Sequence, residues 1–216
     1  ACLPADAATQ QALLEAAKVY IQQALYQGQV ARAQQAVDLA WQLARHTGDA
    51  EQQALAHWCS ALFYLNRAIR QSLAHYEQAL RFYRQAQRVE EEGRLLIGYA
   101  GQMSLLGEFQ AAEAAIQRAI ACLATRPDYR DWPMVYINLA HIQGQAGRYT
   151  EMLASAHQGE ALAQQFAQKV PDQAPYYQLL CAQAVVNQAY ALIIQAHFSP
   201  AEARLLAAEQ LAQRCH

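Results

Sequence analysis

The side chains most suited to catalysis or metal binding are cysteines and histidines, and they are scattered along the chain. The motif that comes nearest to a reactive pair is His57-Trp58-Cys59. On a helix, side chains two residues apart point about 200° apart, so this histidine and this cysteine cannot easily share a metal ion or a proton. We therefore interpret Cys59 as a buried thiol beside a histidine, and Trp58 as a packing residue.

Other combinations of reactive side chains are no stronger. His141 and His157 fall on different predicted helices and have no carboxylate partner in the sequence. The run Glu90-Glu91-Glu92 suits the start of a helix, where carboxylates complement the macrodipole, although it could also contact a basic partner. The chain contains no Gly-rich phosphate loop, no G-x-S-x-G and no H-E-x-x-H. The sequence thus predicts no catalytic residue, no metal ligand and no cofactor, and a protein that is not an enzyme.

Composition and charge exclude two classes of partner. The 216 residues carry 16 Lys and Arg against 18 Asp and Glu, a formal net charge of −2, and no Lys/Arg cluster occupies one predicted helix face. Nucleic-acid binding normally needs a basic patch, and binding to a membrane surface a polybasic one. The stretch 179–198 is uncharged, but its Gln, Asn and His side chains lie on several faces, which favours a core helix over a membrane span. We expect neither nucleic acid nor a membrane as partner.

The cysteines indicate the redox compartment. They are odd in number and widely spaced, and no C-x-x-C pair occurs, so neither a zinc motif nor a redox motif is supported. Reduced, mostly buried thiols in a cytoplasmic protein are the simplest interpretation. The five positions are Cys2, Cys59, Cys122, Cys181 and Cys215.

The elements that must position any binding residues come from an internal repeat. Each of five segments begins with a short turn, and an apolar residue follows two places on. A small residue comes three places later, a large apolar residue four places after that, and in most copies another small residue three places further. The first residue of the small class falls at 33, 72, 112, 152 and 201, so the copies follow one another after 39, 40, 40 and 49 residues. These spacings keep the small residues on one face of a helix, where a partner helix can approach closely. In the fourth copy Met152 replaces the small residue.

The copies resemble tetratricopeptide repeats (TPR) over roughly residues 8 to 214. The stretches Leu73-Ala74-His75-Tyr76-Glu77-Gln78-Ala79-Leu80 and Leu106-Gly107-Glu108-Phe109-Gln110-Ala111-Ala112 are typical of that family. The period of about 40 residues exceeds the standard ~34, and the Trp and Pro positions of the consensus are mostly absent. A period of about 40 is similar to arrays attached to bacterial signalling proteins. These include proteins with a CHAT-type, caspase-like protease domain and regulators with a nucleotide-switch domain.

The resemblance implies an all-α fold, a right-handed α-α superhelix of about five antiparallel helix pairs. No linker divides the chain, so we expect a single domain over residues 1–216. Asp49 and Ser199 suit N-caps, Pro200 suits a first helical position, and Pro171 should end the eighth helix. The predicted helices are 8–27, 30–46, 50–66, 69–88, 91–106, 109–124, 131–146, 149–169, 173–196 and 199–214.

In the family, the first helix of each pair lines a concave face, which implies where a partner would bind. Counting back from each turn gives a surface of mixed polarity, suited to an extended peptide or a helix. Chaperone-binding relatives clamp a carboxylate with Lys and Asn, but here Gln22 stands in place of the Asn, so that partner is not predicted. Ile137, Gln183 and Val186 also fall on this surface. The principal candidates are Lys18, Gln22, Tyr26, His57, Tyr64, Arg94, Ile97, His141, Gln145 and Tyr190.

Three functions remain open at this stage. The first is a protein–protein interaction scaffold whose groove binds a peptide, a helix or a neighbouring domain. The second is a ligand-sensing array of a bacterial signalling or transcription regulator, and the third an array that regulates an attached CHAT-type protease. Exposed apolar end faces would also allow a homodimer. The sequence stops just after a second helix without a polar cap, so the final helix docks on a neighbour or, as we favour, the chain is a piece of a longer protein.

Overall fold

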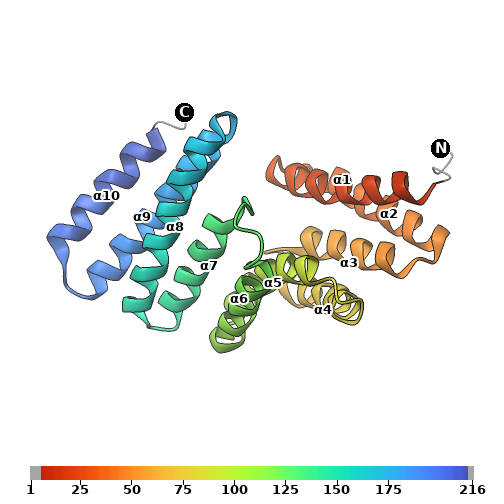
Figure 1. Cartoon of the computed structure of the whole chain (residues 1–216), viewed down its shortest axis with the longest axis horizontal. Coiled ribbons are helices and arrows are strands. Elements are labelled where there is room, and N and C mark those ends of the chain that lie inside the picture. The colour runs from red at the N-terminus through yellow and green to blue at the C-terminus, as the bar shows by residue number, and fades with distance from the viewer. Residues whose placement is uncertain (1–5, 214–216) are drawn as a thin grey trace. The chain divides into compact units, whose positions relative to one another are not determined.

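The computed structural model describes residues 6–213, which form α-helices joined by short turns (Figure 1). Over these residues there are ten α-helices, one 3₁₀ turn and no strand. Every α-helix boundary lies within three residues of the one predicted from the sequence. The helices are α1 (Ala7–Tyr26), α2 (Val30–Thr47), α3 (Ala50–Tyr64), α4 (Ile69–Gln85), α5 (Val89–Leu105), α6 (Phe109–Leu123), α7 (Trp132–Gln145), α8 (Tyr149–Lys169), α9 (Ala174–Ile194) and α10 (Phe198–Gln213), with η1 (Pro171–Gln173) before α9.

The turns inside the hairpins explain why the boundaries could be predicted. Gly28, Gly107 and Gly147 have φ values of 71°, 82° and 76°, the left-handed conformation that ends a helix and that glycine adopts without strain. Ala196 takes the same conformation in the fifth repeat, with φ 60°. In the second repeat the left-handed residue is Asn66, one place before the predicted turn position.

One predicted cap is confirmed and one is wrong. The Asp49 side chain accepts a hydrogen bond from the backbone N–H of Gln52 at 2.9 Å, so it caps α3. Ser199 is not a cap, because α10 begins at Phe198 and includes both Ser199 and Pro200 in its first turn. Proline is tolerated there because the first N–H groups of a helix have no partner within it. Pro171 follows the end of α8, as predicted.

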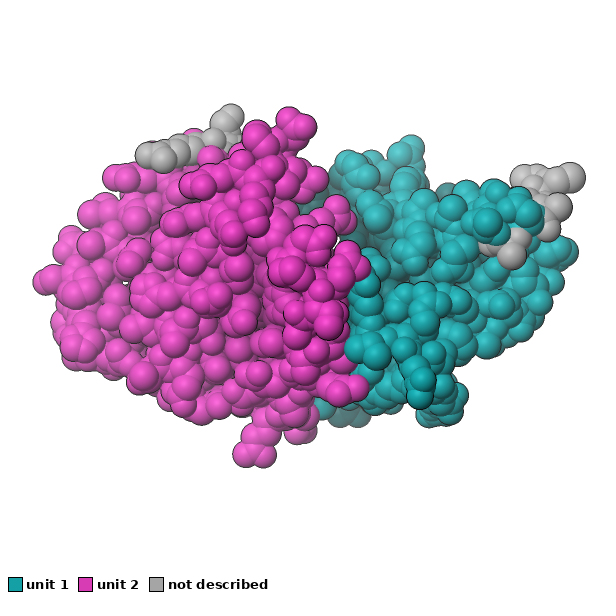
Figure 2. All heavy atoms as spheres, viewed as in Figure 1, with its two compact units in different colours: residues 1–106 teal, residues 107–216 magenta. Residues whose placement is uncertain are grey.

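The chain divides into two compact units, residues 1–106 and residues 107–216 (Figure 2). Unit 1 comprises α1 to α5 and unit 2 comprises α6 to α10. The boundary lies in the turn of the third repeat. The single domain over residues 1–216 stays a prediction.

In unit 1, α3 packs against both helices of the preceding hairpin, α1 and α2, and against its own partner α4. The repeat positions behave as the pattern predicts: Ala33, Ala40 and Ala79 are fully buried, and Tyr76, three residues before Ala79 on α4, is 1% exposed. Ser72, at the small position of the second repeat, donates from its hydroxyl to the backbone oxygen of Ala61 at 2.9 Å. The small residues therefore bring the two helices of a hairpin close together.

In unit 2, α9 packs against α7, α8 and α10. Its buried contacts include a cluster of Ala140, Met152, Ala156 and Ala191. The segment Pro171–Ile194 has the length and mean hydropathy, 1.2, of a membrane-spanning helix, and half of it is buried inside the unit. The core helix of a helical protein has the same properties, so this composition is weak evidence for a membrane span.

A close contact between α4 and α5 gives a stability test. A Cβ added at Gly98 would lie 2.7 Å from Cζ of the buried Tyr76 ring, whereas a Cβ at Gly101 meets nothing within 4 Å. We expect Gly98→Ala to lower the free energy of unfolding by about 1–3 kcal/mol through overpacking. Gly101→Ala on the same helix should raise it by about 0.5–1 kcal/mol, because alanine is the better helix former. Urea denaturation followed by circular dichroism measures both, and equal stability of the two variants would contradict the contact.

Candidate functional site

A hollow of about 560 Å³ opens in unit 2 between α7, α9 and α10. It is formed by the first helices of the fourth and fifth repeats and by the second helix of the fifth. Leu205 and Val186 on its walls are 46% and 47% exposed. The lining residues are Ile137, Asn138 and His141 from α7, Ala182, Gln183, Val186 and Asn187 from α9, and Leu205, Ala208, Glu209 and Ala212 from α10.

The chemistry of this hollow is apolar with amides at its edges. The sequences of α7 and α9 contain no Asp, Glu, Lys or Arg. With His141 counted as neutral, Glu209 is the one charged residue among the eleven that line the hollow. The Asn187 amide donates to the backbone oxygen of Ile137 at 3.4 Å, which ties α9 to α7. Such a surface suits a large apolar group of a ligand, and the carboxylate of Glu209 is a polar group that could fix its orientation.

Some of the predicted surface is found here and some is not. His141 lines the hollow, as do Ile137, Gln183 and Val186. Tyr190 does not; its half-exposed ring meets the Tyr149 ring of α8 edge-on, with centroids 6.2 Å apart. Gln145 is exposed at the last position of α7, outside the lining. The four lining residues of α10 were missed, because the sequence prediction considered only the first helix of each pair.

In unit 1 two predicted residues meet at one indole ring. Lys18 Nζ lies 3.7 Å from the centroid of the Trp58 ring, and Arg94 Cζ lies 5.4 Å from it. Lys18 also pairs with Glu15 at 2.6 Å and is only 5% exposed, so its prediction as an open groove residue is wrong. Burial lowers the Lys18 pKa, although Glu15 acts in the opposite direction. The pair of cations holds Trp58 in place between the first helices.

The neighbouring cysteine has the role expected for it. Cys59 is fully buried, and its thiol lies 3.9 Å from the backbone oxygen of Leu14. Burial raises the pKa of this thiol to about 12. A thiol that stays protonated is neither a nucleophile nor a metal ligand at neutral pH.

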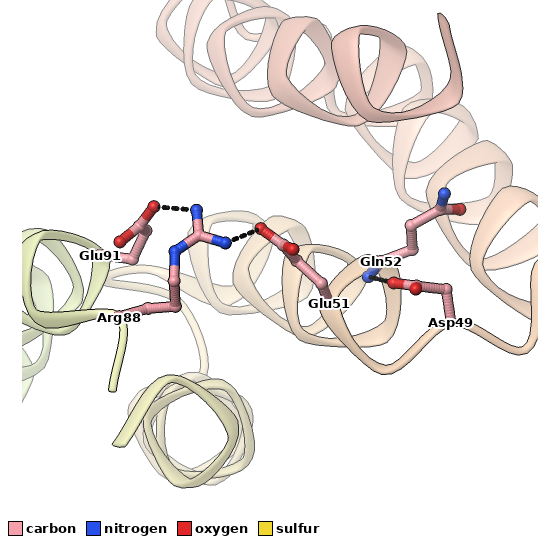
Figure 3. A network of polar contacts seen from close by, with 5 residues as sticks. All are labelled: Asp49, Glu51, Gln52, Arg88 and Glu91. Carbon is pink, nitrogen blue, oxygen red and sulfur yellow. Dashed lines mark hydrogen bonds and ion pairs between the residues drawn. The ribbon is translucent and has the colours of Figure 1, made fainter. Parts of the chain in front are cut away.

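The acidic run at the start of α5 is engaged by arginines of its own unit. Arg88 donates to Glu51 of α3 at 2.7 Å and also to Glu91, so one guanidinium bridges two helix starts (Figure 3). Burial acts to raise the Glu91 pKa, but the hydrogen bond from Arg88, a backbone hydrogen bond and the charges of Arg88 and Arg94 together outweigh it, so the pKa is lowered. Glu92 accepts from Arg84 Nε at 3.0 Å. The helix start is confirmed, and Glu91 and Glu92 make contacts within the unit.

His57 and Tyr64, predicted to lie on the concave face, have ring partners on second helices. Nδ1 of His57 lies 3.0 Å from Nδ1 of His75 on α4, within hydrogen-bond distance. The Trp41 ring of α2 packs edge-on against His57 at 4.8 Å, and Tyr64 stacks on His75 at 5.8 Å. These partners come from the second helices, so His57 and Tyr64 belong to hairpin packing. His57 and His75 lie on the two different helices of one hairpin, α3 and α4. The spacing of residues along the chain therefore could not predict that they meet.

The remaining predicted residues belong to unit 1 and are not among the lining residues of the hollow. Gln22 and Tyr26 are exposed on α1, Tyr26 to 95%, and Ile97 is half-buried on α5. Among the described residues, no group of three or more His, Cys, Asp and Glu side chains could hold a metal ion.

Comparison with known proteins shows the fold. No family model and no curated protein matches this sequence. Among similar solved structures, BtubC (BKLC) from P. vanneervenii has 18% identity and a TM-score of 0.78 over 97% of this chain and 83% of that one. The nearly identical TPR-like repeats of a putative kinesin light chain from Podosopora anserina have 17% identity and a TM-score of 0.68 over 98% of each chain. MamA has 12% identity and a TM-score of 0.60 over 89% of this chain and 94% of that one. The chain folds as TPR-like helical repeats. The predicted all-α array of helical hairpins is confirmed.

The His57–His75 pair predicts a pH dependence of stability. Burial, and secondly the charge of His75, lower the His57 pKa from 6.5 to about 4, and burial lowers the His75 pKa as well. Between these values the unfolded chain binds more protons than the folded one. The stabilisation is therefore complete above pH 6.5 and is lost as the pH falls towards 4.

We expect the melting temperature of the native chain to be lower at about pH 5 than at about pH 7.5. His57→Gln should reduce this difference, since one of the two titrating groups is removed. His141→Gln, at an exposed position, serves as the control and should leave the difference unchanged. A His57→Gln variant with the full pH dependence of the native chain would show that the pair does not cause it.

Proposed function

We propose that this protein is a non-catalytic interaction scaffold that binds a helix or peptide of another protein in the hollow between α7, α9 and α10. The hollow itself carries the proposal: about 560 Å³ lined by helices of two successive hairpins, with one charge among eleven residues. Concave, largely apolar surfaces with a few polar groups are the usual sites of ligand and helix binding.

The fold supports an interaction role in general. The similar structures are TPR-like repeat proteins, a fold that usually serves as a scaffold for protein–protein interaction. Repeat arrays present extended surfaces because each hairpin contacts only its neighbours. A cytoplasmic location, a homodimer, and the exclusion of nucleic-acid and membrane partners stay predictions from the sequence.

The chemistry of the side chains supports a non-catalytic role. Cys59, two residues from His57 in the sequence, is a buried thiol with a raised pKa. His57 and His75 contact each other and the rings of Trp41 and Tyr64, and none of these contacts supplies a carboxylate to orient a catalytic imidazole. An acid–base or nucleophilic site needs such a third group at a pocket.

A second candidate function is favoured by the size of the hollow. Its volume of about 560 Å³ lies within the ~300–1,000 Å³ typical of small-molecule sites. Its edges offer His141 and the amides of Asn138, Gln183 and Asn187. A sensor array of a bacterial regulator, with a small inducer in this hollow, is therefore the alternative.

Two leucines on α10 give a matched test. Leu205 lines the hollow and is 46% exposed, whereas Leu206 beside it is 54% exposed and is not among the lining residues. Burying a leucine side chain contributes about 1.5–3 kcal/mol, so Leu205→Glu should weaken partner binding at least ~10-fold. Leu206→Glu should leave binding close to that of the native chain.

The measurement is affinity capture combined with a photo-crosslinker placed at position 186, which also lines the hollow. We expect crosslinked protein products that Leu205→Glu abolishes and Leu206→Glu retains. Equal capture by the two variants would exclude the hollow as the interface. A small molecule that co-purifies with the native chain and is lost in Leu205→Glu, without any protein product, would favour the sensor.

A further inference from the structure

Two histidines of unit 1 face each other across a hairpin. Nδ1 of His57 on α3 lies 3.0 Å from Nδ1 of His75 on α4, and the two rings are tilted by 45° with their centroids 5.2 Å apart. In such a contact one neutral ring donates its N–H and the other accepts with its lone pair. The same ring nitrogens of neutral imidazoles are the commonest metal ligands in proteins. The hairpin therefore brings two metal-ligating atoms to one point.

Aromatic neighbours hold both imidazole rings in place. The Trp41 ring meets His57 edge-on at 4.8 Å, and its own position is fixed because Trp41 Nε1 donates to the Ser60 hydroxyl at 2.9 Å. The Tyr64 ring stacks on His75 at 5.8 Å. These contacts keep the two imidazoles side by side, as the preorganisation of a metal site requires.

The pair lies well inside unit 1 and is still reached by solvent. On one side α3 packs against α1 and α2, and on the other α4 packs against α5. The two helices that carry the histidines thus have neighbours on both sides within the unit. Both histidines are half-buried. An ion can therefore enter from solvent and keep part of its water shell.

The separation of the two nitrogens selects among metal ions. Bonds from imidazole nitrogen to a divalent ion are about 2.0–2.1 Å long. Two such bonds to nitrogens 3.0 Å apart enclose an angle of about 95°. This is the angle between neighbouring positions of a square-planar or octahedral ion, whereas a tetrahedral ion needs nitrogens about 3.3 Å apart. Tetragonal sites of nitrogen and oxygen ligands suit Cu²⁺ and Ni²⁺, and tetrahedral ones suit Zn²⁺.

Only small changes convert the hydrogen bond into a metal site. The ion lies about 1.4 Å to the side of the line between the two nitrogens, so each ring must turn about χ2 to aim its lone pair. This torsion is soft, because it joins an sp³ to an sp² carbon. The ring that donated from Nδ1 carries its proton on Nε2 instead, by exchange with water. Both rings stay neutral, and no proton is released overall.

We propose that His57 and His75 bind a divalent transition-metal ion, Cu²⁺ or Ni²⁺, through their Nδ1 atoms, with water in the remaining coordination positions. The ion ties α3 to α4. Over the residues that the structure describes, no group of three or more His, Cys, Asp and Glu side chains could hold a metal. The site is thus an exchangeable two-ligand site and not a closed structural one. It lies in unit 1 and is independent of the hollow in unit 2.

The first test is calorimetric titration of the 216-residue chain with Ni²⁺, after bound metal has been removed with EDTA. We expect one ion per native chain. His57→Gln and His75→Gln should each weaken binding at least ~10-fold, because even the loss of an outer-shell partner costs a metal site about that much. His46→Gln removes an exposed histidine of α2 and is the matched control. It should leave the affinity unchanged.

Two further measurements do not depend on how well the variants fold. Electron paramagnetic resonance of the native chain with one equivalent of Cu²⁺ should show a tetragonal centre with two nitrogen ligands. Ni²⁺ should also raise the melting temperature of the native chain, because the paired ligands exist only in the folded state. His57→Gln should lose most of this rise, and its circular dichroism spectrum checks that it is folded.

Several outcomes would overturn the site. They are a native chain that binds no Ni²⁺, equal affinity of the native chain and both histidine variants, and a Cu²⁺ spectrum with fewer than two nitrogen ligands. Equal losses in His46→Gln and His57→Gln would show adventitious binding to surface histidines. Tighter binding of Zn²⁺ than of Ni²⁺ would overturn the assigned geometry. Affinity capture through the hollow of unit 2 is unaffected by all of these results.

Discussion

The close approach of neighbouring helices through small side chains is the constraint on which the rest of this structure depends. Ala33, Ala112 and Ala201 hold the same repeat position and are at most 1% exposed. With a methyl group at the contact, two helix backbones can pack without a void, and every larger residue nearby is fitted around that distance. Gly98 against Tyr76 is the extreme case, where even a methyl group would overlap the ring.

This constraint also explains how much the sequence could predict. The small residues recur with a period of about 40 because the helices meet at the same place in each hairpin, and glycines mark where the first helix ends in the first, third and fourth repeats. Helix ranges and fold class follow from these two signals. The turn at Asn66 was displaced by one residue because its conformation comes with a side-chain contact to Gln102, at 2.9 Å, that joins residues 36 apart. No periodic pattern encodes such a contact.

The candidate site was predictable only in part, for a related reason. The face of the first helices was assigned by counting back from each turn, and His141, Ile137 and Val186 do line the hollow. Counting cannot foresee that Trp58 lies over Lys18 and buries it, or that His57 turns towards His75.

Charge has a different role from packing in this array. Only 16% of the residues are charged, and several of them pair between successive hairpins: Arg88 with Glu51, Arg148 with Glu113, and Arg204 with Glu160. Partly exposed pairs contribute little stability, at most about 1 kcal/mol each, so packing of the apolar faces must hold the hairpins together. The pairs instead disfavour wrong registers between helices, because a shifted helix would leave a carboxylate without its donor.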